Sequence, residues 1–174
     1  MASQPPAPID RVLRLFHLDF APAHRQPRTI SVVIATVLAL VGSLAADALL
    51  VTIGSAVFPS TRGYVHFQVL DYGKLTVIGV VIACAAWPIV TRISSAPRWL
   101  FLRMAIAVTL VLWLPDVYIL MRGQPPRAVA VLFVMHLAIA VVTYNCLVRI
   151  ARIRPLAAGN ARAPQPGRHA SQRR

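Results

Sequence analysis

Residues 30–57 read "ISVVIATVLALVGSLAADALLVTIGSAV", a run of 28 residues in which Asp47 is the only charged side chain. The hydrocarbon core of a bilayer is about 30 Å thick, and an α-helix needs about 20 apolar residues to cross it. Because water is absent at that depth, a single span must satisfy its own backbone, and a helix does so. The run therefore predicts a transmembrane helix. A cleaved signal peptide is not expected, because the run and the polar segment before it are both too long.

Three further apolar runs follow, at residues 75–90, 99–121 and 128–148. Of the 174 residues, 57% are hydrophobic and only 13% are charged, whereas about one quarter of a soluble domain is charged. The last two connections, "TRISSAPR" and "RGQPPR", are short, which favours antiparallel neighbours. The sequence therefore predicts an all-α fold, an integral membrane bundle of four transmembrane helices over residues 30–150.

The chain is strongly basic, with 18 Lys and Arg against five Asp and Glu and a net charge of +13. In a soluble protein this excess would suggest nucleic-acid binding. Here the basic residues flank the apolar runs, so we expect the lipid bilayer and its anionic lipids as partners, and no nucleic acid. Fourteen of the eighteen lie before the first run, around the second connection and after the last run. This bias predicts a multi-pass plasma-membrane protein with both termini in the cytoplasm.

The two flanking segments are predicted to differ. In the N-terminal segment, residues 1–29, the apolar residues from position 9 to position 20 form one stripe of a helix. This predicts a short amphipathic helix at the membrane interface, or alternatively one packed against the protein's own loops. The tail, residues 151–174, is rich in Pro, Gly and Arg and is predicted to be disordered. Lipid-headgroup contacts are expected from five arginines: Arg11, Arg14, Arg149, Arg152 and Arg154.

Ionisable residues at membrane depth are the best candidates for a functional site, because each costs about 3 kcal/mol at the bilayer centre. The first, third and fourth runs contain Asp47, Asp116 and His136. Counted from the outer ends of their spans, all three lie roughly 8–15 Å below the surface, so they can meet. Pro115 frees a backbone carbonyl one turn earlier, and we expect Asp116 to face the interior there, paired with His136 or with water. The three residues form either a proton- or cation-responsive site or a hydrogen-bonded cluster that only sets helix register.

Other features predict structure. Residues 65–69 alternate apolar and polar side chains, which suggests a short extended segment in the first outer connection. Trp87, Trp99 and Tyr118 lie near span ends and are expected to be interfacial anchors. Arg103 is expected to extend toward lipid phosphate.

No signature of catalysis is present. Cys84 and Cys146 lie in separate apolar runs without the spacing of a metal or thiol-redox site, so we expect buried structural cysteines. The glycine, serine and histidine patterns of familiar hydrolases and nucleotide-binding enzymes are missing. We therefore expect no catalytic residue, no metal, no cofactor and no enzymatic activity.

The segment "VMHLAIAVVTY" of the last run, which follows "WLPDVYIL" and a short Pro-containing connection, carries a family resemblance. It resembles a group of uncharacterised actinobacterial four-helix membrane proteins, a domain of unknown function with a Met-His pair early in the last helix. Met135 and His136 match that pair. The resemblance covers about residues 30–150 and implies four helices, a plasma-membrane location and no established activity.

Two functions are compatible with these features. The first is a small non-enzymatic plasma-membrane protein that serves as an accessory or structural subunit, with a membrane-protein partner or as a homo-oligomer. The alternative is a small proton-coupled transporter that uses Asp47, Asp116 and His136.

Overall fold

The computed structural model describes residues 12, 13, 15, 17, 18 and 24–155. Four long helices dominate it: α2 (Thr29–Val57), α3 (Val69–Ile93), α4 (Pro97–Met121) and α5 (Pro126–Ile150). Each is long and apolar enough to cross a membrane, which confirms the four predicted apolar helices. Helix α3 is longer than the apolar run at residues 75–90 that predicted it. It begins at Val69, six residues earlier, and it continues past Pro88 to Ile93.

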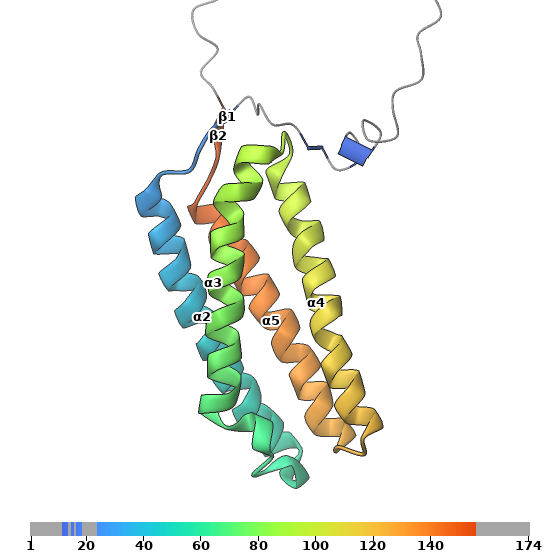
Figure 1. Ribbon diagram of the computed structural model, residues 1–174. Helices are drawn as coiled ribbons and strands as arrows, with labels where there is room; N and C mark the ends of the chain where they lie inside the picture. Colours follow the sequence, from blue (N-terminus) through green and yellow to red (C-terminus); the bar gives the residue numbers. More distant parts are fainter. Residues whose placement is uncertain (1–11, 14, 16, 19–23, 156–174) are drawn as a thin grey trace, which may run out of the picture.

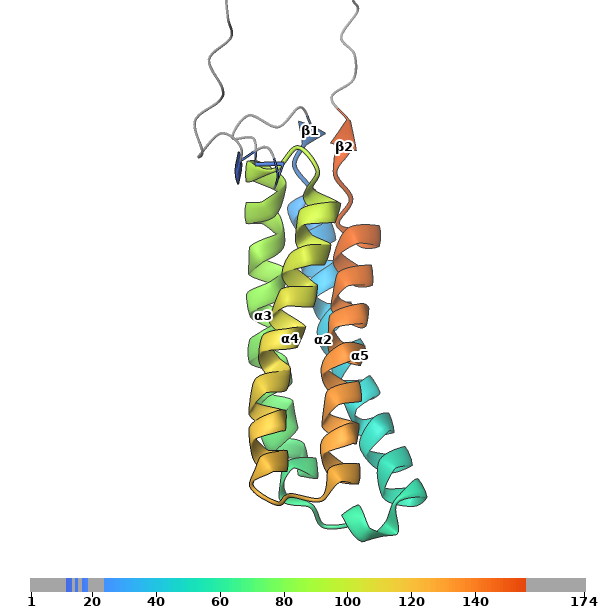
Figure 2. The ribbon, with the colours of Figure 1, turned by 90° about the vertical axis from the view of Figure 1, so that its right-hand side faces the viewer.

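The helices run up and down side by side (Figure 1). Helix α5 contacts all three others, most extensively α2, and α4 lies beside α5 and α3 (Figures 1 and 2). The described ends of the chain and the α3–α4 turn lie together, which we call the terminal end. The α2–α3 and α4–α5 connections lie at the other end, which we call the loop end. Residues near these two connections therefore meet although they are far apart in sequence.

Short connections are built from residues suited to helix ends. Pro97 and Pro126 occupy the first positions of α4 and α5, where a missing N–H costs nothing. After α4, Gly123 has a positive φ of 84°, and its N–H donates to the carbonyl of Leu120. The N–H of Gln124 reaches the carbonyl of Ile119 at 3.2 Å, which completes a Schellman motif. This glycine-dependent stop turns the chain directly into α5.

The contact between α2 and α5 depends on small residues. The buried face of α2 consists of Ala35, Ala39, Ser43, Asp47 and Gly54. A Cβ atom placed on Gly54 would lie 2.8 Å from Cγ2 of Val131, and one on Gly42 would lie 3.0 Å from Cγ1 of Val142. Small side chains let the two backbones approach closely, as is common between membrane helices.

The connection at the loop end differs from the prediction. Residues 65–69 were expected to be extended, but they form the 3-10 turn η2 (Val65–Phe67) and the first turn of α3, and η1 (Pro59–Thr61) precedes them. The alternation has another cause: Phe67 is buried against α3 and α5, while Val65 and Val69 are exposed. The extended prediction was therefore wrong.

The terminal end is closed by the segments that flank the bundle. Strands β1 (His24–Arg25) and β2 (Arg154–Pro155) pair antiparallel. Nε2 of His24 donates to the carbonyl of Thr91 at 2.7 Å, and the Thr91 hydroxyl donates to Oε1 of Gln26 at the same distance. Both segments are therefore tied to the bundle. The predicted amphipathic helix, residues 9–20, lies largely outside the described residues.

Candidate functional site

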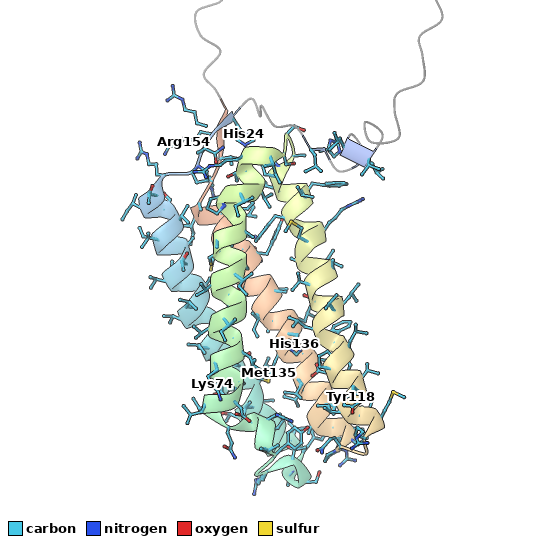
Figure 3. All side chains as sticks on the ribbon, viewed as in Figure 1. His24, Lys74, Tyr118, Met135, His136 and Arg154 are labelled. Carbon is cyan, nitrogen blue, oxygen red and sulfur yellow. The ribbon has the colours of Figure 1, made fainter. Side chains whose placement is uncertain are left out.

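The three ionisable residues singled out in the sequence lie in the half of the bundle nearer the loop end. Asp47 is ten residues from the end of α2, Asp116 is five from the end of α4, and His136 is ten from the start of α5. At 1.5 Å per residue these positions are about 15, 8 and 15 Å from the helix ends. Figure 3 shows His136 between α5 and α4, closer to the loop end than to the terminal end.

Asp116 and His136 form the central pair. Oδ2 of Asp116 lies 3.0 Å from Nδ1 of His136, and the two side chains are 7% and 25% exposed. The distance suits a hydrogen bond, but the angles do not, so neither atom has a hydrogen-bond partner among the described residues. The pair is thus in contact, and neither atom is satisfied by a hydrogen bond.

Asp47 has a different partner. Its Oδ2 accepts a hydrogen bond of 2.6 Å from the hydroxyl of Thr76 on α3, while its Oδ1 has none. Because Gly54 faces Val131 and Gly42 faces Val142 on the antiparallel helices, Asp47 lies near the level of His136. The same register places Ser43 near the level of Thr143.

Four polar residues form one polar cluster inside an otherwise apolar bundle. Its members come from all four helices: Asp47, Thr76, Asp116 and His136. Three of its polar atoms are buried without a hydrogen-bond partner among the described residues: Asp47 Oδ1, Asp116 Oδ2 and His136 Nδ1. Buried polar groups are normally paired, so three unpaired atoms in one region require a reason. They provide several free acceptors for a proton or for water.

The loop end covers this cluster. Tyr64, between η1 and η2, packs edge-on against Phe67 and belongs to the shell of a buried apolar group: Phe67, Tyr72, Ala128, Val131, Leu132 and Met135. Its hydroxyl is buried and has no hydrogen-bond partner among the described residues. Burial, and then the negative charge of Asp116, raise the pKa of the Tyr64 phenol above its ordinary value.

The terminal end is sealed by an apolar layer. Trp87 is fully buried and donates from Nε1 to the carbonyl of Ala151 at 3.0 Å. Its ring lies 5.1 Å from that of Phe101, which lies 6.0 Å from that of Tyr144. The prediction that Trp87 is an interfacial anchor was wrong, because this side chain fills the core.

The other predicted residues have mostly structural surroundings. The guanidinium of Arg103 lies 3.7 Å from the ring centre of Trp99, and Tyr118 is exposed. Cys84 is buried and Cys146 partly buried, and neither forms a disulfide. Arg149, Arg152 and Arg154 are exposed at the terminal end, whereas Arg11 and Arg14 lie outside the described residues.

The chemistry available here is proton binding. No three His, Cys, Asp or Glu side chains of the described residues are grouped closely enough to hold a metal ion. Two shallow apolar grooves occur on the outside, about 480 Å³ between α2 and α3 and about 260 Å³ between α4 and α5. Neither is lined by Asp47, Asp116 or His136. The cluster itself offers two carboxyl groups and one imidazole, a set that can take up and release protons.

Sequence reasoning missed Thr76 and Tyr64. Thr76 shares a buried face with Tyr72, Val80 and Cys84, and this spacing of four residues marks the inner side of α3. The spacing does not show which hydroxyl of that face meets Asp47. Tyr64 lies in an irregular connection, and no periodic signal marks its position.

No protein-family model matches this chain, and no curated protein or solved structure is detectably similar to it.

Proposed function

We propose that the chain is a small multi-pass plasma-membrane protein with both termini in the cytoplasm, and that it catalyses no reaction. Four helices of spanning length support the membrane location. The excess of basic residues before α2, around the α3–α4 turn and after α5 supports the orientation. In this orientation Arg149, Arg152 and Arg154 would contact anionic headgroups of the inner leaflet.

Proton-coupled transport is the function that the polar cluster supports best, with Asp47, Asp116 and His136 as the proton site. The observation that carries this proposal is the Asp116–His136 contact with Asp47 near the same level, where three buried polar atoms have no hydrogen-bond partner among the described residues. A cluster that served only packing would gain stability by pairing every atom. Unpaired acceptors are instead what a site needs if its proton occupancy changes.

A proton would change the charge and the packing of the cluster together. With one proton shared between Asp116 and His136, the pair has no net charge, either as an ion pair or as two neutral groups. Loss of that proton leaves a carboxylate beside a neutral imidazole, which is costly at this depth. The resulting force between α4 and α5 would couple proton release to a helix shift. Because one bundle is small, we expect the transporting unit to be an oligomer.

Reconstitution in liposomes tests this proposal. The internal pH of proteoliposomes is followed with a trapped dye after a pH gradient is imposed. Asp116→Asn is nearly isosteric and should abolish the protein-dependent proton flux while the protein stays folded. The matched control is Asp71→Asn, because Asp71 is a carboxylate near the loop end that pairs with Lys74 at the surface. Unchanged flux in Asp116→Asn would contradict the proposal.

An accessory or structural subunit is the second candidate, and the surface of α4 favours it. Only 11% of the 18-residue apolar stretch of α4 is buried, the smallest such share among the four helices. The groove beside it is bordered by the small residues Ala105, Thr109 and Ala140, which allow another helix to approach closely. This candidate predicts no proton flux in purified proteoliposomes. Substitutions in the cluster would then change only stability.

A further inference from the structure

The antiparallel pairing of β1 and β2 places two arginines directly opposite each other at the terminal end. The register of the two strands joins Arg25 to Arg154 and His24 to Pro155. Residues directly opposite each other have their side chains on the same face, with Cβ atoms about 5 Å apart. Both arginines are exposed, and Figure 3 shows Arg154 beside His24 at this end of the bundle. We call Arg25 and Arg154 the arginine pair.

The neighbours of Arg25 fix the direction of its side chain. Nε2 of His24 and Nε2 of Gln26 both donate to the carbonyl of Thr91, at 2.7 and 3.0 Å. The hydroxyl of Thr91, a fully buried residue, donates back to Oε1 of Gln26 at 2.7 Å. Because successive side chains of a strand point to opposite faces, the inward position of His24 turns Arg25 outward. The arginine pair is therefore held in position by the end of α3.

The charges of the arginine pair are not balanced by a carboxylate of the described residues. The acidic residues in that part of the chain are Asp47, Asp71 and Asp116, and all three lie in the half of the bundle nearer the loop end. The ion pairs of the described residues include neither Arg25 nor Arg154. Like charges directly opposite each other destabilise a strand pair. An anion bound between the two guanidinium groups would therefore stabilise the pairing of β1 and β2.

The depth of the arginine pair indicates the source of this anion. Helix α2 has 29 residues and is about 44 Å long, whereas the hydrocarbon core is about 30 Å thick, so its ends extend into the headgroup layers. Arg25 lies four residues before Thr29, the first residue of α2, and Arg154 lies four residues after Ile150, the last of α5. Lipid phosphates lie at this level, and planar guanidinium groups bind phosphate through paired N–H donors.

We propose that Arg25 and Arg154 together bind the phosphate of one anionic phospholipid, and that this ligand keeps the two flanking segments paired. The inference rests on the proposed membrane location and is independent of the proton site. A zwitterionic lipid should bind more weakly, because its own cation is repelled by the arginine pair and by the other exposed arginines of this end: Arg28, Arg92, Arg98, Arg149 and Arg152. Arg152 differs from the pair, because its Nε donates to the carbonyl of Arg149 at 2.6 Å at the end of α5.

Lipid binding to the full-length protein in a non-ionic detergent tests this site. Dioctanoyl phosphatidylglycerol is added at constant ionic strength, and its Kd is obtained from the rise in melting temperature. Arg25→Gln and Arg154→Gln should each weaken binding about tenfold, the loss expected for a charge-assisted hydrogen bond. The double variant should lose much less than the roughly hundredfold expected of two independent contacts, because both arginines serve one phosphate. Arg92→Gln is the matched control, since it removes one exposed charge at the same end but lies outside the strand pair.

Each outcome supports or overturns the shared site. Losses confined to the arginine pair, with a double variant no worse than about tenfold, support it. An equal loss in Arg92→Gln overturns it, because the attraction then depends only on total charge. Equally tight binding of inorganic phosphate or of dioctanoyl phosphatidylcholine overturns the assignment to an anionic lipid. Without lipid, Arg25→Gln should melt no lower than the wild type, because the substitution relieves repulsion, and a lower melting temperature would contradict the proposal. Absence of proton flux in proteoliposomes would leave this binding result unaffected.

Discussion

At the scale of single residues, the Asp116–His136 pair is explained by the cost of each member alone. An ionisable side chain at membrane depth costs about 3 kcal/mol on insertion scales. At 3.0 Å, each side chain supplies the other with a polar neighbour and offsets part of that cost. The gain is bounded, because interhelical hydrogen bonds in membranes average about 0.6 kcal/mol. The contact between Asp116 and His136 therefore contributes too little free energy to explain the fold. It is well suited to a change of protonation state.

A double-mutant cycle tests the contact. Asp116→Ala and His136→Ala should each lower stability, because each leaves the other group buried without its neighbour. The double variant should be at least as stable as the less stable of the two single variants. The interaction free energy between the two substitutions should be about 0.6 kcal/mol, and at most about 1.7 kcal/mol. Melting of the purified protein in detergent measures this. The control cycle pairs Asp116→Ala with His66→Ala, which lies at the surface and should be additive. Additive losses for Asp116 and His136 would mean that they do not interact.

Sequence reasoning reached this pair by counting residues. The constant rise of a helix fixes depth, so Asp116 and His136 were expected at similar levels. Which polar neighbours complete the cluster depends on rotation and tilt, which no count supplies. Thr76 was missed for that reason, and Tyr64 because its connection is irregular. Trp87 was misplaced because nearness to a span end does not tell whether a side chain faces lipid or the core.

At the scale of elements, the close approach of α2 and α5 holds the cluster together. Small residues on α2 bring Asp47 to the level of His136, and the Schellman turn at Gly123 returns the chain so that α4 lies beside α5. The spacing of Ser43, Asp47 and Gly54 in the sequence is that of one face of a helix with small and polar residues. It did not indicate which helix would pack there, because all four runs are similarly apolar.

Substitution of Gly54 tests this packing. Gly54→Ala should destabilise the bundle, because the added methyl meets Cγ2 of Val131 at 2.8 Å, and a valine on a helix has little rotational freedom. The overpacking cost of about 1–3 kcal/mol exceeds the gain in helix propensity of about 1 kcal/mol. Gly79→Ala on α3 is the matched control, since nothing lies within 4 Å of its added methyl. Its melting temperature should be equal to or above that of the wild type.

Rescue completes that experiment. Val131→Ala in the Gly54→Ala background removes the two methyl groups that the new side chain would meet. Stability should then rise above that of Gly54→Ala alone. Equal melting temperatures for Gly54→Ala and Gly79→Ala would show that α2 and α5 do not approach closely at this level.

At the scale of the whole molecule, the two segments that flank the helices place both described ends of the chain at the same end of the bundle. The β1–β2 pair and the hydrogen bonds of His24 and Gln26 to Thr91 hold both described ends at the α3–α4 turn. An even number of spanning helices leads to the same arrangement. The sequence predicted it from charge alone, because the basic residues before α2 and after α5 belong to one side. The strand pairing was not expected in a segment rich in Pro and Arg.

Cysteine labelling tests the orientation that follows from this arrangement. Single cysteines are introduced by Ser171→Cys and Ser60→Cys in a background that carries Cys84→Ala and Cys146→Ala. Ser60 lies in η1 and is exposed at the loop end, and the fourteen basic residues on the opposite side favour the cytoplasm for that side. A membrane-impermeant maleimide should therefore label position 60 in intact cells and position 171 only after the cells are opened. The background without an introduced cysteine controls for residual labelling. Labelling of position 171 in intact cells would reverse the orientation, and the loop end, with Tyr64, would then face the cytoplasm.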